Sequence, residues 1–497
     1  MPLPPEDFAH DLEFLRHAAR DIFAHALKQC SVANAFAQKV RVDGTLLRID
    51  DVDFDLSHYD RVRIVAAGKA AAPMLAELLQ RLPQGDAWNL AGILAAPDAP
   101  ESLPQNIAHF PSGHPLPNAA SLQAGCAARA MLEALPRDAE SARRTLCIFC
   151  ISGGASAMLE EPLDPAMTLE DVQNFHRALV HSGAPIAEMN CVRKHFSAVK
   201  GGRLAMAAPR GATLVALLIS DVPAHALAEL GSGPVLPDPT TLAQCRAVID
   251  HYALAEAFPA RVHNFFEQNH LPETPKPGAF PMQVCTLLDA QDLLTAARER
   301  AEALGFFTRT DTSCDDWEYM AAARHLLERL HDLRQPTQRA ARASAAQPAA
   351  APRSVCLLSG GELSVPVPER CGVGGRNQQW ALYAETEMET EDAPVVVLSA
   401  GTDGLDGNSP AAGALVDSAT MQRAAQLGLD VERALQSFDA HPLCDALGAT
   451  ICTGPTGNNL RDLRVLLAKT EPEAQKKIEP PKKKPPVRWV KSGTRRR

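Results

Sequence analysis

The chain of 497 residues is 46% hydrophobic and 22% charged, so it can bury a sizeable core and is long enough for two or more domains. Its formal net charge of −10 excludes a general nucleic-acid binder, which needs a basic face, but allows small anionic substrates held by local positive charge. The N-terminus has early acids and no uninterrupted apolar core, and no later segment is long enough to cross a bilayer. Scattered cysteines suit free thiols in a reducing compartment, so we expect a cytoplasmic protein without a membrane partner.

Apolar, β-branched runs alternate with helical stretches in the first half of the chain. The alternation predicts a parallel, Rossmann-like sheet. A representative helix is expected at 119–135. The expected strands lie at 61–68, 90–97, 145–152 and 213–220. Cys147 and Cys150 would point to opposite faces of the third strand, so we interpret them as core residues and not as metal ligands.

A second series of strands predicts a second α/β unit. These strands are expected at 284–290, 306–311, 355–361 and 395–401. The proline-rich segment 234–241 suits a connection between the units, and 272–281 is interpreted as a loop inside the second unit. The composition of 335–354 and of the basic tail beyond 468 predicts disorder. The predicted domains are therefore 1–235 and 236–468, with a low-complexity insert at 335–354 and a disordered tail at 469–497.

Small residues follow three of the expected strands. Two strands end on Ser-Gly-Gly, at 152–154 and 359–361, and a third runs into SAGTDG at 399–404. In open α/β sheets, ligands bind at the carboxyl ends of the strands, where glycines let backbone N–H groups approach an anion. A tight β-to-α turn alone would give a similar pattern, but three such turns favour a ligand site. The binding candidates from these turns are Ser152, Gly153, Gly154, Ser156, Ser359, Gly360, Gly361 and Thr402.

Two common nucleotide-binding patterns are absent. The segment around Lys69 has Arg63 where a P-loop needs glycine and Ala70 where it needs a hydroxyl. GVGGRN at 372–377 ends on Asn377 and does not directly follow a strand, so it is not a dinucleotide fingerprint. Lys69 itself comes immediately after an expected strand, a position that can aim an ammonium into a cleft, although a solvated helix lysine would look the same.

The segment 184–205 predicts one amphipathic helix. Its apolar stripe is formed by Met189, Val192, Phe196 and Val199. Polar and cationic side chains fall on another face and are candidates for a phosphate or carboxylate clamp: Asn190, Arg193, Lys194 and Lys200. An ordinary solvated face explains the same pattern and stays open as the alternative.

An ordered set of motifs resembles the class II glycerate kinases, also called the glycerate 2-kinase or MOFRL family, from about residue 8 to 468. The motifs are AAGKA, ISGGASAM, NCVRKHFSAVKGGRLA, LISDVP, SGPVLPDPTT, LLSGGE, GGRNQ, SAGTDGLDG, AAGALVD and TGPTGNN. The resemblance implies two α/β domains with the active site in the cleft between them and a MOFRL region at 353–468. It further implies transfer of the ATP γ-phosphoryl group to the 2-hydroxyl of D-glycerate, with a divalent metal such as Mg²⁺.

The same resemblance implies catalytic roles for Lys69 and Arg376. Asn377 and Gln378, which follow that arginine, are further candidates for substrate or nucleotide binding. Lys and Arg aimed from opposite domains are suited to phosphoryl transfer, which depends mainly on positioning and on stabilising negative charge. The candidates for holding Mg²⁺ or the substrate hydroxyl are Asp221, Glu362, Asp403 and Asp406.

The chain departs from the usual family pattern at a few positions. His225 and Ala226 stand where an acidic pair is usual, Pro410 replaces an acidic residue, and Asn118 replaces an aspartate. If the missing acids bind metal, turnover is weak; if they shape loops, little changes.

Two alternative functions stay open. A hydroxypyruvate reductase, a label that members of the family often carry, would need a nicotinamide site that the sequence does not provide. A non-catalytic binding protein would have kept the cleft and lost the chemistry. The presence of Lys69 and Arg376 argues against this second alternative.

Overall fold

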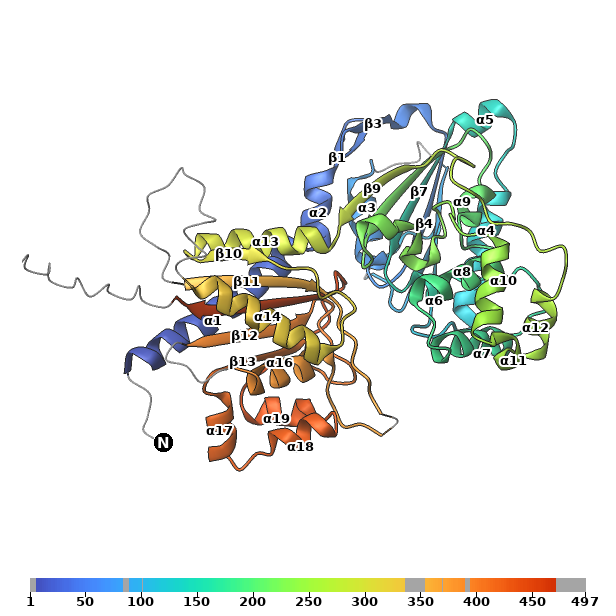
Figure 1. Cartoon of the computed structure of the whole chain (residues 1–497). Helices are drawn as coiled ribbons and strands as arrows, with labels where there is room; N and C mark the ends of the chain where they lie inside the picture. Colours follow the sequence, from blue (N-terminus) through green and yellow to red (C-terminus); the bar gives the residue numbers. More distant parts are fainter. Residues whose placement is uncertain are drawn as a thin grey trace, which may run out of the picture.

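Two α/β lobes lie side by side in the computed structural model (Figure 1). We call them the first unit, which runs from α2 to β9, and the second unit, which contains α1 and everything from α13 onward. The predicted insert, apart from its end residues, and the predicted tail beyond residue 470 lie outside the described residues; Lys469, which the prediction placed in the tail, is the last residue of a strand. The structure describes residues 6–83, 89–100, 102–335, 354–368, 370–388 and 394–470.

A six-stranded parallel sheet forms the centre of the first unit, in the order β6-β5-β4-β7-β8-β9. Helices cover both of its faces, which explains why its central strands are continuous apolar runs. The strands expected in the first half of the chain are confirmed. The sheet consists of β4 (Arg61–Ala67), β5 (Asn89–Ala96), β6 (Ile107–Pro111), β7 (Thr145–Ser152), β8 (Thr213–Ile219) and β9 (Gln283–Leu288).

The helices of the first unit form three groups. One face of the sheet is covered by α2 (Val32–Lys39) and α3 (Ala71–Arg81). The other face is covered by α4 (Ala119–Glu133), α6 (Ala155–Met158) and α9 (Arg203–Ala207), with η2 (Ala224–Ser232) alongside. A separate helical cluster contains α7 (Leu169–His181), α8 (Ile186–Phe196), α10 (Leu242–His251), α11 (Leu254–Ala257) and α12 (Ala260–Phe266). Smaller elements are β1 (Val40–Asp43), β2 (Leu46–Ile49), β3 (Val52–Asp55), η1 (Leu56–His58) and α5 (Ala139–Arg143).

The second unit has a mixed six-stranded sheet in the order β10-β11-β15-β12-β13-β14. Only β10 and β11 pair in parallel; the other neighbours are antiparallel. The α/β class with two units is confirmed, but the expectation of mainly parallel strands fails in this sheet because β15, which we did not predict, runs between β11 and β12. The strands are β10 (Phe307–Thr310), β11 (Ser354–Gly361), β12 (Val395–Gly401), β13 (Gly413–Asp417), β14 (Thr450–Ile451) and β15 (Asp462–Lys469).

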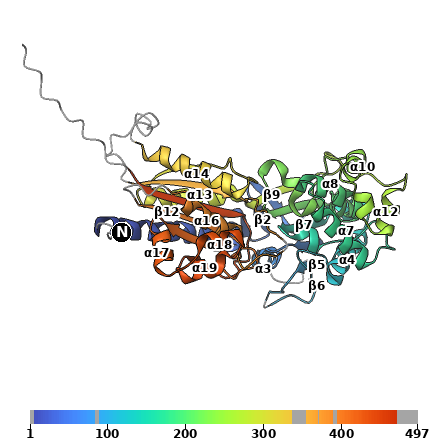
Figure 2. The same ribbon diagram turned by 60° about the horizontal axis from the view of Figure 1, so that its bottom comes forward.

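Helices also cover both faces of this second sheet (Figure 2). One face packs against α1 (Glu6–Gln29) and α13 (Ala290–Ala303). The opposite face packs against α14 (Tyr319–Arg334), α16 (Arg376–Thr386), α17 (Thr420–Gln426), α18 (Val431–Gln436) and α19 (Ala440–Ala446). No helix in the ranges that the structure covers is both long and apolar enough to span a membrane.

The chain crosses between the units twice, once from α1 to α2 and once from β9 to α13. The prediction that strand 284–290 belongs to the second unit is therefore wrong, because β9 pairs with β8 of the first sheet. The connection is not at 234–241, and the loop 272–281 lies in the first unit. The N-terminal helix joins the second unit because its apolar face, with Leu15 and Ile22 fully buried, covers that sheet.

Candidate active site

A cleft of about 780 Å³ lies between the two units. The first unit contributes Lys69, His114, Gly154 and Asp221. The second unit contributes the larger wall, including Glu362, Arg376, Asp403, Asp406 and Asn459. Strand ends and the loops after them supply most of these residues, as expected for ligand sites of α/β sheets. The predicted residues Lys69, Gly154, Asp221, Glu362, Arg376, Asp403 and Asp406 are thus brought together.

Lys69 is held where β4 ends and α3 begins. Its backbone N–H donates to the carbonyl of Gly153 at 2.8 Å. Its ammonium donates to Asp403 Oδ2 of the second unit at 3.2 Å, so the side chain reaches across the cleft. Gly68 precedes it with φ +119, and a Cβ at that position would overlap Ser152. The sequence Gly-Lys therefore brings this strand end close to the first Ser-Gly-Gly turn.

Both Ser-Gly-Gly turns make room for a carboxylate. A Cβ on Gly153 would overlap the carboxylate of Asp221. A Cβ on Gly361 would come within 2.6 Å of Asp315 Oδ1. One glycine of each turn thus admits an aspartate from a neighbouring loop, and anion binding by these turns stays a prediction. Of the six residues in these turns, only Gly154 lines the cleft.

The hydroxyl side chains predicted to bind ligand contact other parts of the protein instead of the cleft. Ser152 Oγ accepts from the backbone N–H of Ala70 at 3.0 Å, and Thr402 Oγ1 donates to the carbonyl of Arg461 at 2.7 Å. Ser359, in strand β11 of the second sheet, is fully buried. Ser156 is within 2.8 Å of Ser232. None of these four hydroxyl residues lines the cleft.

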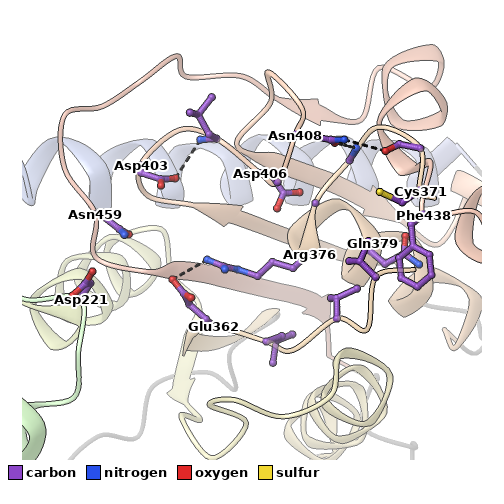
Figure 3. Close-up of a pocket in the computed structure, with 18 of the residues that line it drawn as sticks. Asp221, Glu362, Cys371, Arg376, Gln379, Asp403, Asp406, Asn408, Phe438 and Asn459 are labelled. Carbon is purple, nitrogen blue, oxygen red and sulfur yellow. Dashed lines mark hydrogen bonds and ion pairs between the residues drawn. The ribbon is translucent and has the colours of Figure 1, made fainter. Parts of the chain in front are cut away.

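Arg376, the first residue of α16, lies between two carboxylates. Its Nε and Nη2 donate to Asp462 at 2.7 and 3.0 Å, and Nη2 is also 2.8 Å from Glu362 Oε1 (Figure 3). Burial favours the neutral form of Asp462, but the Arg376 guanidinium holds its pKa below the ordinary value. For Glu362 burial prevails and raises its pKa despite the same arginine. Asp462 is therefore an ionised, fully buried anchor for Arg376.

Asp406 accepts hydrogen bonds from the backbone N–H groups at the start of α16, which have no partner within the helix. Its two carboxylate oxygens accept from the backbone N–H groups of Asn377 and Gln378 at 3.0 and 2.9 Å, and from both amide side chains. Burial raises the pKa of Asp406, although these hydrogen bonds oppose the shift. The predicted ligand residues Asn377 and Gln378 therefore hold an aspartate, and Asp406 caps a helix.

Two residues near Lys69 and Arg376 were missed by the sequence reasoning. His114 lines the cleft next to Lys69 and Gly154, and burial together with the Lys69 ammonium lowers its pKa. Arg461 pairs with Asp315 at 2.6 Å and has φ +71, a strained value for a residue other than glycine. The motif GHPLPN could have drawn attention to His114; nothing in the sequence distinguishes Arg461.

The cation-rich helix does not form a clamp at the cleft. The predicted helix 184–205 ends at Phe196, where Ser197 is extended, so Lys200 does not share a helical face with Arg193. Lys194 is buried against Glu229 and Asp238, at 2.7 and 3.3 Å. Arg193 donates to Asn190 at 3.0 Å. Neither the clamp nor the solvated face applies, because the lysines are buried in internal ion pairs.

Lys200 belongs to a fully buried cluster with Glu160 and His176. Its ammonium contacts Glu160 Oε2, and His176 Nε2 is 3.2 Å from the same oxygen. Burial opposes ionisation of Glu160, but Lys200 and His176 lower its pKa to about 2. Burial lowers the pKa of His176 to about 4. At neutral pH the cluster is an ion pair with a neutral imidazole, so its role is structural.

Of the residues that depart from the family pattern, two are exposed at the surface and one performs the same structural role as the usual residue. Asn118 caps α4 through a reciprocal pair of hydrogen bonds with Ser121, which is the capping role that aspartate also performs. His225 and Pro410 are exposed. His225 borders a second, smaller cavity that lies next to Arg461 and is separate from the main cleft.

Three carboxylates at the cleft have the chemistry that Mg²⁺ requires. Asp221, Glu362 and Asp403 present hard oxygen ligands, and Mg²⁺ needs only one or two of them when phosphates and water complete the shell. Among the residues that the structure describes, no three acidic, histidine or cysteine side chains are already grouped as a metal site. The donor set thus fits a magnesium ion whose coordination is completed by groups other than these side chains.

Comparisons with known proteins agree with this architecture. Residues 18–267 match a family described as a domain of unknown function (DUF4147), and residues 355–462 match the MOFRL family. The D-glycerate 2-kinase of Thermotoga maritima is 32% identical over 81% of this chain and 90% of its own length. A putative hydroxypyruvate reductase of Agrobacterium vitis is 33% identical over 82% of this chain and 87% of its own. A crystal structure of glycerate kinase from Thermotoga maritima, 29% identical, superposes with a TM-score of 0.73 and covers 92% of this chain and 99% of that one.

Two α/β units that face each other across a charged cleft define a two-domain α/β enzyme. The chain belongs to the glycerate 2-kinase (MOFRL) family.

Proposed function

We propose that this protein transfers the γ-phosphoryl group of ATP to the 2-hydroxyl of D-glycerate, giving 2-phosphoglycerate and ADP. The observation that carries the proposal is the position of Lys69 and Arg376, which come from opposite units and line one cleft. Phosphoryl transfer requires two anions to be held together while negative charge is stabilised. Two cations on opposite walls meet that requirement.

In the reaction, the glycerate O2 atom forms a bond to the γ-phosphorus while the bond from that phosphorus to the bridging oxygen of ADP breaks. The hydroxyl proton leaves to water or to a nearby carboxylate. Asp462 fixes Arg376 through Nε and Nη2, so the guanidinium would present Nη1 to the phosphate oxygens. Lys69 supplies a point charge from the other wall. Both interactions strengthen as charge develops on the transferring group.

Asp221, Glu362 and Asp403 would hold Mg²⁺ on the nucleotide. The ion would neutralise charge on the phosphates and orient them. Asp221 belongs to the first unit and Glu362 to the second, so the carboxylates also face each other across the cleft. We further propose that the protein acts in the cytoplasm, because its twelve cysteines are all free thiols.

The experiment that tests the function is a coupled ADP-release assay with D-glycerate and a panel of small hydroxy acids. D-glycerate and Mg·ATP should give ADP, and the product should be consumed by enolase without phosphoglycerate mutase, which identifies 2-phosphoglycerate. Oxidation of NADH with hydroxypyruvate, without use of ATP, would overturn the proposal. Tight binding of ATP and glycerate without turnover would indicate a non-catalytic relative.

A further inference from the structure

The wall that the second unit contributes to the cleft has an apolar part. We call Leu363, Val365, Val367 and Phe438 the apolar shelf; all four line the cleft. Val367 is 56% exposed, so its side chain is accessible to a ligand in the cleft. In Figure 3, Phe438 lies on one side of Arg376, while Asp221 and Asn459 lie on the other. The cleft therefore has a charged end and an apolar end, with Arg376 between them.

Phe438 is held in a conformation that bulky residues avoid. Its φ is +52, and it lies between α18 and α19. The turn is secured on both sides, because the Phe438 N–H donates to the Leu435 carbonyl at 3.3 Å and Asp439 accepts from the Val373 N–H at 2.8 Å. Backbone strain of this kind costs free energy and is retained where it positions a functional group. Here it presents an aromatic ring to the cleft.

Gln379 adds a polar group to the same end of the cleft. It lines the cleft and is 2% exposed, and its Nε2 donates to the Leu435 carbonyl at 2.9 Å. Its Oε1 is buried and has no hydrogen-bond partner among the described residues. A buried acceptor without a donor is destabilising, so a ligand that supplies an N–H would be favoured there.

We propose that the adenine ring of ATP lies on the apolar shelf and that Gln379 Oε1 accepts a hydrogen bond from its exocyclic amine. The inference rests on the proposed function in taking ATP as the phosphoryl donor. A flat, neutral base matches the apolar end, and the polyanionic triphosphate matches the end with Lys69 and Arg376. Glycerate, which has no apolar surface, belongs at the charged end. Guanine carries a carbonyl where adenine carries the amine, so Gln379 would select ATP over GTP.

Calorimetric titrations of the full chain with ADP, GDP and pyrophosphate test this inference without phosphoryl transfer. Stacking of a base on an aromatic ring is worth enough to change affinity about tenfold, so Phe438→Ala and Val367→Ser should each weaken ADP binding by about that factor. Pyrophosphate binding should not change. Gln379→Leu should reduce the preference for ADP over GDP by about tenfold. Val180→Ser, at an equally exposed valine of α7, is the matched control and should bind all three ligands normally.

Two results would overturn the inference. If the wild-type protein binds ADP no more tightly than pyrophosphate, the base adds no binding energy and there is no adenine site. If the variants of the apolar shelf bind ADP with wild-type affinity, the base does not lie on the apolar shelf. Thermal melting confirms that each variant is folded, and three independent positions guard against failure of one. If ADP binds as expected while D-glycerate is not phosphorylated, the proposed function fails and the adenine site stands. If D-glycerate is phosphorylated while the variants of the apolar shelf bind ADP normally, the proposed function stands and the adenine site fails.

Discussion

Lys69 Nζ lies 3.2 Å from Asp403 Oδ2, and this ion pair joins the first unit to the second across the cleft. Both side chains are partly exposed, at 33% and 27%, so the pair contributes less than about 1 kcal/mol to the free energy of unfolding. Its importance is therefore positional. It holds an ammonium at the point where the two walls come together.

Lys69→Ala should lower kcat about 10²–10³-fold and change KM for ATP and D-glycerate much less, because the lost interaction grows in the transition state. Steady-state kinetics with both substrates varied measures this. The control is Lys469→Ala, since Lys469 also pairs with an aspartate, Asp11, but lies outside the cleft. A loss below about tenfold for Lys69→Ala would remove it from the catalytic machinery.

Arg376→Lys should rescue activity poorly, with kcat reduced about as much as in Arg376→Ala. A lysine cannot reproduce the two parallel bonds that the guanidinium makes to Asp462 while it keeps a further nitrogen for phosphate. Near-normal kcat in Arg376→Lys would show that only the charge matters.

Asp462→Asn should lower both stability and kcat. It leaves Arg376 and the fully buried Arg464 without their shared carboxylate, and breaking a buried pair typically costs about 3 kcal/mol or more. Urea denaturation and kinetics on the folded variant separate the two effects. Unchanged stability would mean that Asp462 is not ionised in the folded protein.

Gly153→Ala should reduce kcat about 10²-fold, because the new methyl group would push the Asp221 carboxylate out of place. A double-mutant cycle with Asp221→Asn measures the coupling. The two changes should be strongly non-additive, since both act on one carboxylate. Simple additivity would show that the glycine serves only the backbone turn.

The buried cluster of Glu160, His176 and Lys200 predicts loss of stability in acid. The pKa of His176 falls from 6.5 to about 4 on burial, so the unfolded state binds more protons between these values and stability falls as the pH drops through that window. The pKa of Glu160 falls from 4.5 to about 2, which adds a second loss in that lower range. Melting temperatures of wild type and His176→Gln, measured from pH 7 to 4, test the first part. The melting temperature of the variant should fall less steeply with decreasing pH than that of the wild type. Equal slopes would contradict the lowered pKa of His176.

The strands of the first sheet could be predicted from sequence because their burial on both faces leaves unbroken apolar runs. The same reasoning missed β15, although seven of its eight residues are buried, because Asp462 and Arg464 interrupt the run with charges. Inside the fold, Asp462 pairs with both Arg464 and Arg376. When the charged residues of a strand pair with residues far away in the sequence, the local sequence does not show that the strand is buried.

The candidate site was predicted unevenly for a similar reason. Lys69 stands at a recognisable strand end and Arg376 stands in a motif of the family that the chain resembles, and the structure brings both to the cleft. Lys194 and Lys200 matched the pattern of an exposed cationic face but have buried acidic partners more than thirty residues away in sequence. Phe438 and Gln379 carry no motif, because their placement depends on a strained turn and on tertiary packing.

The second unit brings together the earliest and the latest parts of the described chain. Its first helix, α1, packs on a face of the sheet in which β15 is a central strand. During synthesis, α1 emerges from the ribosome with an apolar face and must wait for more than four hundred residues before β15 is made. The first unit can fold meanwhile, because all its strands precede α13. The second unit closes its sheet only after β15 is made, so its assembly has a high contact order, and α1 keeps an uncovered apolar face until then.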